Sequence, residues 1–573
     1  MKARRRLQRP AHSPAGADPV TRVHAHRGIT DPAQVDHTLQ GLPPHAPLSG
    51  IDAATALLET TLRQDGSILV VGDFDADGAT STALALRALK AMGATRLDYL
   101  VPNRFEYGYG LTPEIVAVAA ARAPDLILTV DNGIASVEGV RAARERGIRV
   151  LVTDHHLPGE VLPEADALVD PNLPGDPFPA KALAGVGVIF YVMAALRSRL
   201  RDAGWFARCG LAEPNMAAFL DLVALGTVAD VVPLERTNRI LVEQGLRRMR
   251  AGRAVPGIQA LLEVAGRNPA RVVASDLGFG AGPRLNAAGR MDDMSIGIEC
   301  LLADDPARAR TLARTLDDLN RERREVEQQM QAEALEGLRT VLDHGVDLEG
   351  WHGLCVHEPH WHQGVIGIVA SRLKERLHRP VIAFAPGEEG ALKGSARSIP
   401  GLHMRDALAG IDAAHPGLMS RFGGHAMAAG LTLPADHLET FRRLFDAQVR
   451  DAMDPAALEG VIHSDGPLAD HELNLEIAEA LRAAGPWGAG FPEPLFDGVF
   501  QILERRWLSG RHLRLRLRHG GTEIGGIAFN ADPEDWPQDR ERVHLAYRLD
   551  ANEFRGACSA QLVVEHVLAP EEA

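Results

Sequence analysis

The chain has 573 residues with 46% apolar and 24% charged side chains, an ordinary soluble composition, and its length excludes a single core and predicts three or four domains. No apolar run approaches the roughly 20 residues that span a bilayer, and the basic start MKARRRLQRP lacks the apolar core of a signal peptide, so we expect a cytoplasmic protein with no membrane segment. The net charge of −15 does not exclude a polyanionic substrate, because a local groove decides such binding.

The first elements follow an arm of unusual composition. Residues 1 to 45 are rich in Arg, His and Pro, and we expect them to form a loosely attached N-terminal arm. From 46 to 265, short strands alternate with Ala- and Leu-rich helical stretches, which predicts a doubly wound α/β domain with a parallel sheet. The clearest helix is expected from Ala79 to Met92, with N-terminal N–H groups that could hold a phosphate.

Three apolar runs in this domain, each predicted to be a buried parallel strand, lead into possible metal ligands. The runs and the side chains after them are Ile68 to Val71 with Asp73, Asp75 and Asp77, Leu126 to Val130 with Asp131, and Val150 to Thr153 with Asp154, His155 and His156. Because ligands in open α/β sheets bind outside the carboxyl ends of the strands, these clusters should meet at one rim. Their carboxylates and imidazoles suit a pair of divalent cations, which offset the repulsion between the acids.

The acids of the first two clusters allow more than one interpretation. In a regular strand Asp75 and Asp77 would share a face, whereas in a strand-to-helix turn they can bind two neighbouring ions. Asp131 can bridge both ions, although an Asp before Asn-Gly can also be a simple turn former. The presence of the other clusters favours the metal interpretation.

The histidines and one further acid complete the set. Imidazole suits Mn²⁺ or Zn²⁺ better than Mg²⁺, which makes His155 a ligand candidate, while His156 would meet the substrate phosphate and Asp154 would fix an imidazole tautomer. Asp230 follows a long apolar stretch, where a metal would explain an otherwise costly acid. Two ions about 4 Å apart activate a water and stabilise in-line attack on phosphorus, so we expect phosphoryl hydrolysis. No Walker lysine or nucleophile elbow indicates another chemistry.

The rest of the chain is expected to form three further parts. Residues 266 to 345 should end in a long connecting helix from Pro306 to about Leu342, whose polar middle either bridges solvent between two lobes or packs along one lobe. A second α/β domain is expected over 346 to 455. Residues 456 to 573 have short alternating runs and Gly/Pro turns, as a small β-barrel would.

One strand of this barrel is strongly basic. Leucines and arginines alternate from Leu513 onwards, and the arginines of the run are Arg514, Arg516 and Arg518. This arginine face either binds a polyanion or keeps a solvated edge strand from aggregating. Aromatic stacking in an electrostatic groove is how such barrels hold single strands, and about half of the nearby aromatic residues should be core. Those residues are Trp487, Phe491, Phe496 and Trp507.

Several motifs together resemble the DHH phosphoesterase superfamily and its RecJ branch. The strings VVGDFDADGATSTAL, DNG and TDHH, with Asp230 in ALGTVADVVPL, resemble the first four superfamily motifs. GPRLNAAGRM, KGSARS and GGHAMAAG resemble further motifs of the RecJ branch and the DHH-associated domain, and GPWGAGFPEPLF resembles the entrance to its oligonucleotide-binding barrel. The resemblance covers residues 45 to 570 in order. It implies a single-strand-specific 5′ to 3′ DNA exonuclease with DHH, DHH-associated and OB-fold domains.

The resemblance also implies roles for individual residues. The metal ligands would be Asp73, Asp75, Asp77, Asp131, His155 and Asp230, with two divalent cations, Mn²⁺ or Mg²⁺, as cofactors. His156 would contact phosphate and act in catalysis with Asp75, Asp77 and Asp131; Asp73 stands where many members have a histidine. The residues that would contact substrate are Tyr109, Arg284, Asn286, Arg290, Ser395, Arg397 and His425. GGHAMAAG can alternatively serve tight helix–strand packing.

The same resemblance implies partners and leaves two competing functions. The resemblance implies a monomer that acts on single-stranded DNA in repair and recombination, with a single-strand-binding protein and a RecQ-type helicase as partners. One alternative is a small-substrate DHH phosphoesterase acting on pyrophosphate, short oligoribonucleotides or cyclic dinucleotides, which the arginine strand disfavours. Another is a catalytically inactive, DNA-binding replication scaffold, which should have lost metal ligands, whereas every candidate ligand is present here.

Overall fold

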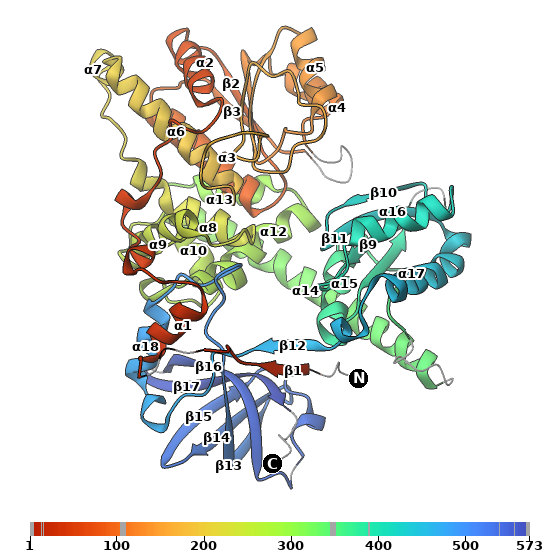
Figure 1. Ribbon diagram of the computed structural model, residues 1–573. Coiled ribbons are helices and arrows are strands. Elements are labelled where there is room, and N and C mark those ends of the chain that lie inside the picture. The colour runs from red at the N-terminus through yellow and green to blue at the C-terminus, as the bar shows by residue number, and fades with distance from the viewer. Residues whose placement is uncertain are drawn as a thin grey trace.

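The computed structural model describes residues 5–12, 14, 16–102, 110–343, 351–387, 390–537, 539–554 and 556–568. Figure 1 shows an α/β domain at the top, a group of helices in the centre, a second α/β domain at the right and a barrel at the bottom. Within the described residues, no helix is both long and apolar enough to cross a membrane.

The first sheet is parallel and covered on both faces. Its strands lie in the order β3 (Leu97–Leu100), β2 (Ile68–Val71), β4 (Leu126–Val130), β5 (Arg149–Thr153) and β6 (Ala167–Val169). Side chains of one face pack with α2 (Ile51–Arg63), α3 (Ala76–Ala91) and α6 (Gly185–Asp202). Those of the other face pack with α4 (Pro113–Ala120) and α5 (Val137–Glu145). The doubly wound architecture predicted from the alternating pattern is confirmed.

The helix expected from Ala79 begins three residues earlier. Asp75 is the N-cap of α3, and its carboxylate accepts hydrogen bonds from the backbone N–H groups of Asp77 and Gly78, at 2.9 and 3.0 Å. An Asp at the N-cap satisfies two otherwise unpaired donors, and this lets the helix start inside the aspartate motif. Asp75 and Asp77 therefore lie in a strand-to-helix turn, and the regular-strand interpretation is wrong.

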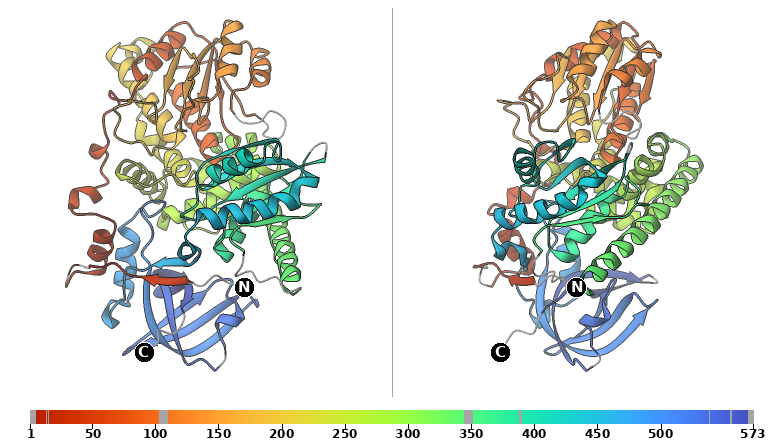
Figure 2. Two further views of the ribbon diagram at one scale, coloured as in Figure 1. Left: turned by 45° about the vertical axis from the view of Figure 1, so that its right-hand side comes forward. Right: turned by 90° about the vertical axis from the view of Figure 1, so that its right-hand side faces the viewer.

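A helical core follows the sheet and leads into one long helix. The core contains α8 (Leu220–Ala229), α9 (Arg236–Arg250), α10 (Pro256–Val264), the π-helical turn η5 (Leu277–Ala281), α12 (Gly282–Met291) and α13 (Ser295–Leu302). The long helix α14 (Pro306–Asp343) buries Ala309, Ala313 and Leu316 in this core and Met330 in the core of the second domain. Figure 2 shows α14 running from the central helices to that domain. The predicted connecting helix is confirmed.

The polar middle of α14 is held by ion pairs at both lobes. Asp317 accepts from Arg284 of α12, and Glu327 accepts from Arg372 of α15 (Ile366–Leu377), at 2.9 and 3.1 Å. Both carboxylates are buried. The helix therefore joins the two lobes through charged contacts on each side, so neither expectation, a solvent bridge or packing along one lobe, describes it fully.

The second domain is a mixed sheet with helices. Its strand order is β10 (Arg421–Gly424), β11 (Ala428–Pro434), β9 (Ala391–Arg397), β8 (Val381–Pro386) and β7 (Leu354–His357), and only the β7–β8 pair is parallel. Helix α15 packs on one face, and α16 (Met404–Ala414) and α17 (Leu438–Ala452) pack on the other.

The last domain is a closed barrel. It is formed by β13 (Phe496–Leu508), β14 (His512–His519), β15 (Thr522–Ala528), β17 (Ala557–Leu568) and β16 (Arg542–Phe554), and β16 pairs back with β13. The basic strand β14 is paired on both sides, with β13 and β15. A closed barrel has no free edge, so the interpretation of this strand as an edge protected by charge is wrong.

The N-terminal arm is anchored rather than loose. Strand β1 (Arg5–Gln8) pairs with β12 (Gly460–His463), and α1 (Pro19–His26) packs on α18 (Leu475–Ala483) with Val23 fully buried. Arg9 and Arg27 each form a bidentate pair with a carboxylate of the barrel region, Asp497 and Asp465. The composition of the arm indicated polar side chains, and two of these side chains attach the arm to the barrel region through ion pairs. The expectation of a loose arm is wrong for the residues described.

Candidate metal centre and substrate-binding residues

The three predicted ligand clusters meet at the carboxyl ends of β2, β4 and β5. Ligand atoms within 4.8 Å of one another form three overlapping groups: Asp73, Asp75 and Asp131; Asp77, His155 and Asp230; and Asp131, His155 and His156. Asp230 arrives from the end of α8, which packs against α3. All six predicted metal ligands therefore lie in one cluster, together with His156.

Asp77 is held by the start of a second helix. Its carboxylate accepts the backbone N–H groups of Gly185 and Val186, at 2.6 and 3.0 Å, in the first turn of α6. The N-terminus of a helix stabilises negative charge. The carboxylate is thereby fixed in the first turn of α3 while remaining beside His155 and Asp230.

Asp131 depends on two neighbours whose roles were not predicted. Its backbone has φ 61°, a left-handed conformation that Asp and Asn tolerate better than other non-glycine residues. The Asn132 amide donates to the Val71 and Val130 carbonyls, at 3.0 and 2.9 Å, and so ties the ends of β2 and β4 together. A β-carbon on Gly185 would lie 2.6 Å from that of Asp131. The glycines at the start of α6 were the only sequence signal of this close approach.

His155 has the features of a neutral metal ligand. Its Nε2 lies 3.1 Å from Asp131 Oδ1 and 3.5 Å from Asp230 Oδ2. Burial lowers the pKa of His155 to about 4, which keeps a lone pair available. Among the described residues, the buried atoms His155 Nε2 and Asp230 Oδ2 have no hydrogen-bond partner. A cation between them would satisfy both atoms.

The carboxylates themselves also require positive charge. Burial, followed by the charges of neighbouring aspartates, raises the pKa of Asp77 and of Asp131 well above the ordinary value. Burial and the charge of Asp75 raise the pKa of Asp230 to about 7. Carboxylate oxygens with one imidazole are a donor set that Mn²⁺ accepts readily and Mg²⁺ also accepts. The residues therefore fit divalent cations, which would let all the acids ionise together.

His156 differs from its neighbour because a buried acid holds its ring. Its Nδ1 lies 2.7 Å from Oδ1 of Asp154, whose other oxygen accepts the Ile134 N–H at 2.8 Å. Burial disfavours the imidazolium, but the hydrogen bond and charge of Asp154 outweigh it and raise the pKa of His156 to about 9. A protonated ring donates at both nitrogens, which suits a phosphate oxygen better than a metal ion.

Two residues of the predicted substrate motif in α12 are used inside the protein. The Arg284 guanidinium is buried against Asp317 and donates to the Gly280 carbonyl at 2.8 Å. Asn286 accepts the N–H of Ala76, at 2.8 Å, which fixes α12 against the start of α3. The structure does not bring the Arg284 side chain to the metal cluster. Asn286 instead positions the turn that carries Asp75 and Asp77, and Arg284 anchors α12 to α14.

Arg290, Ser395 and Arg397 come together between the two lobes. Arg397 donates to Ser395 Oγ at 3.2 Å, and burial together with the charge of Arg290 lowers the pKa of the Arg397 guanidinium. Two arginines close to one another favour an anionic ligand between them. His425 lies on the exposed turn after β10, and its N–H donates to Ala428, the residue that pairs with Arg397. Tyr109 lies outside the described residues.

The arginines of β14 are exposed on the barrel surface. The leucines that alternate with them are buried, as the pattern predicted. Arg518 pairs with Glu523 at 2.6 Å, and Arg516 lies 3.7 Å from Glu504, so acids neutralise part of this face. Three of the four aromatic residues named above are core rather than half of them; only Trp507 is exposed.

Comparison with known proteins places this geometry in a family. Three family models match: the DHH family, N-terminal domain over residues 67–227, the DHHA1 domain over 352–451 and the RecJ OB domain over 464–566. The single-stranded-DNA-specific exonuclease RecJ of Dickeya dadantii (strain 3937) is 58% identical over 549 residues, covering 95% of each chain. The chain belongs to the RecJ family.

Solved RecJ structures share the fold. RecJ from Thermus thermophilus in complex with Mn²⁺ has a TM-score of 0.78 at 32% identity, covering 96% of this chain and 76% of that one. The Mg²⁺ complex from the same organism has a TM-score of 0.74 at 29% identity, covering 99% and 79%. The expected architecture of a DHH domain, a DHH-associated domain and an OB-fold barrel is confirmed for this RecJ family member.

Proposed function

We propose that the chain is a cytoplasmic, metal-dependent exonuclease that degrades single-stranded DNA to mononucleotides from the 5′ end. The observation that carries this proposal is the convergence of Asp131, His155 and Asp230 with the aspartates of the first motif at one sheet rim. The name and the 58% identity of the Dickeya dadantii relative support the substrate class. The complete set of candidate ligands argues against an inactive scaffold.

The metal ligands in this proposal are the six residues of the predicted set, with two ions of Mn²⁺ or Mg²⁺. Asp131, as the shared ligand, would hold both ions together with His155 and the other aspartates of the set. When bound, such ions would supply an activated water and stabilise the negative charge that develops on the oxygens around phosphorus. The chain itself orients the scissile phosphate through the His156 imidazolium, which Asp154 keeps in place at 2.7 Å.

The 5′ polarity rests on the group formed by Arg290, Ser395 and Arg397. Guanidinium and hydroxyl groups can hold a terminal phosphate through charge-assisted hydrogen bonds, and Arg397 already donates to Ser395. His425, on a neighbouring turn of the same sheet, is positioned to contact phosphate or sugar in this proposal. Arg284 and Asn286 act by positioning α12 rather than by touching the strand.

The barrel supplies affinity for the rest of the strand. The exposed arginines Arg514, Arg516 and Arg518 contact phosphates of the single strand, which accounts for a polymeric rather than a small substrate. A passage between the two lobes that admits one strand would exclude a duplex. The proposal includes repair and recombination as the setting, a monomeric enzyme, and a single-strand-binding protein and a RecQ-type helicase as partners that present the strand.

End-blocked substrates test this proposal. Single-stranded DNA carrying an internal and an end label would be digested with Mn²⁺ or Mg²⁺ after the 5′ end, the 3′ end or neither end has been blocked. We expect mononucleotides from the unblocked and 3′-blocked strands and none from the 5′-blocked strand. Degradation that stops only with the 3′ block would contradict the polarity. Hydrolysis confined to dinucleotides or pyrophosphate would contradict the substrate class.

A further inference from the structure

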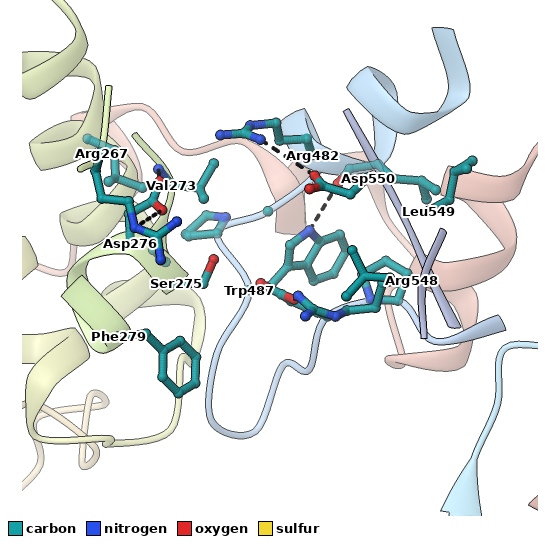
Figure 3. Close-up of a pocket in the computed structure, with 18 of the residues that line it drawn as sticks. Arg267, Val273, Ser275, Asp276, Phe279, Arg482, Trp487, Arg548, Leu549 and Asp550 are labelled. Atoms are coloured by element: carbon teal, nitrogen blue, oxygen red, sulfur yellow. Dashed lines mark hydrogen bonds and ion pairs between the residues drawn. The ribbon is translucent and has the colours of Figure 1, made fainter. Parts of the chain in front are cut away.

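A cavity of about 480 Å³ lies between the helical core and the barrel (Figure 3). Ser275 and Phe279 line it from the core, Trp487 from the segment that enters the barrel, and Phe529 and Asn552 from the barrel itself. This volume is in the range of cavities that hold small organic groups. None of the residues assigned above to metal or substrate lines it.

The cavity adjoins the segment that carries Asp230. The turn η5, which bears Phe279, packs on the end of α8 so closely that a β-carbon on Gly278 would lie 3.3 Å from the Val228 side chain. On the barrel side, the Ala489 carbonyl accepts the N–H of Leu234 at 2.7 Å. Both walls are therefore attached within a few residues of Asp230, on the barrel side of the metal ligands.

Two exposed aromatic rings face this cavity. Among the residues whose exposure the structure describes, only three large aromatic side chains are exposed, namely Phe279 at 73%, Phe529 at 58% and Trp507 at 39%. The two most exposed are the two that line the cavity. An exposed phenylalanine on each of two domains forms an apolar opening, and π-helical turns such as the one under Phe279 occur often at functional sites.

The charges around the cavity are balanced. Three of its arginines lie within ion-pair distance of acids that also line it, and Figure 3 shows two of these pairs. The pairs are Arg267 with Asp276, Arg482 with Asp550, and Arg548 with Glu493. The fourth arginine that lines the cavity, Arg250, is paired in the same way and lies 3.2 Å from Glu243. Such a lining does not attract a phosphate, and it suits an uncharged, flat group with polar edges.

We propose that this cavity binds nucleobases of a single DNA strand between the barrel and the metal centre, with Phe279 and Phe529 as stacking surfaces. Every nucleobase has a flat face, so stacking gives affinity without sequence preference. Ser275 and Asn552 offer hydrogen bonds to base edges. This inference rests on the proposed function, because it places the part of the substrate that has not yet reached the metal ligands.

Binding measurements with matched variants test the stacking role. In an Asp131→Asn background, which prevents digestion, Phe279 and Phe529 would both be changed to Leu, which keeps an apolar side chain, or both to Tyr, which keeps the ring. Fluorescence anisotropy with a thymidine oligonucleotide would be recorded over a range of salt concentrations. We expect the Leu pair to bind roughly tenfold or more weakly with an unchanged salt slope, and the Tyr pair to bind as the background does.

Abasic substitution locates the effect along the strand. One base at a time would be removed from the oligonucleotide, and we expect one or two positions to cost affinity in the background but not in the Leu pair. Affinity of the Leu pair within twofold of the background, or an abasic penalty that persists there, would overturn the stacking role. The parent enzyme's digestion of single-stranded DNA is measured separately, so a failure of the proposed function is distinguishable from a failure of this site.

Discussion

Oδ1 of Asp154 lies 2.7 Å from Nδ1 of His156 and also accepts the backbone N–H groups of His155 and His156, at 2.8 and 3.2 Å. One buried carboxylate thus fixes both the turn after β5 and the ring at its end. The two adjacent histidines therefore differ, since burial lowers the pKa of His155 whereas the contact with Asp154 raises the pKa of His156.

His156→Ala should lower turnover by about 100-fold or more while bound metal stays close to that of the parent. The reason is that a charged donor to the phosphate is lost whereas the six metal ligands remain. Steady-state hydrolysis and metal analysis after gel filtration measure the two effects. His156→Gln, which keeps one donor, should retain more activity than the alanine variant. Loss of a full equivalent of Mn²⁺ would show that His156 is a ligand.

Asp131→Asn should reduce hydrolysis by at least about three orders of magnitude and leave DNA binding detectable, because the bridging carboxylate is removed. Asparagine is the suitable replacement, since it tolerates the φ of 61° at this position as aspartate does and so separates loss of metal from backbone strain. Near-normal turnover in this variant would rule out the two-metal mechanism.

Asp230 should make the metal-free protein less stable as the pH rises from about 4 to about 7, relative to a variant that lacks this acid. The folded-state pKa of Asp230 is raised to about 7, above its unfolded value, so its contribution is favourable at low pH, where the acid is protonated, and is lost as the pH passes through that range. Urea unfolding in the presence of a chelator measures this, and Mn²⁺ should restore stability at pH 7. Asp230→Asn should flatten the dependence; an identical pH profile in that variant would contradict the assignment.

Changing Arg514, Arg516 and Arg518 together to Ser should weaken binding of long single-stranded DNA and flatten the salt dependence. Each phosphate contact on a single strand contributes about 0.7 to the slope of log affinity against log salt, so the slope should fall by up to about 2. Arg514 should account for the largest share, because the described residues place no carboxylate within ion-pair distance of it, unlike Arg516 and Arg518. Hydrolysis of a very short substrate should be largely unchanged. An unaltered slope would mean that this face only aids solubility.

The sheet and the cluster of acids and histidines at its rim were predictable because both depend on local patterns. Ile68 to Val71 and Leu126 to Val130 are short apolar runs, and the structure places strands over those same residues. Aspartates and histidines at strand ends are conspicuous against such runs. The position of Asp230 at the end of α8 also followed from an acid after an apolar stretch.

Contacts between distant segments were not predictable in this way. The pairing of Arg284 with Asp317 and the closeness of Gly185 to Asp131 depend on how helices pack, so the buried carboxylate partner of this motif arginine could not be read from the motif. The attachment of the charged N-terminal arm was not predictable for the same reason, since its partners Asp465 and Asp497 lie more than 400 residues later. The exposure of Phe279 likewise depends on a π-helical turn that no pattern indicated.

The pairing of β1 with β12 has a consequence for biosynthesis. Arg5 is opposite Gly460, so β1 has its partner only after the more than 400 residues between them have been made. Domains generally fold as units from the N-terminus during synthesis. The backbone N–H and C=O groups of β1 therefore have no strand partner until β12 has been synthesised. Pairing of β1 with β12 becomes a late step of folding, and a bulky group attached before β1 would interfere at that late stage rather than with the folding of the DHH domain.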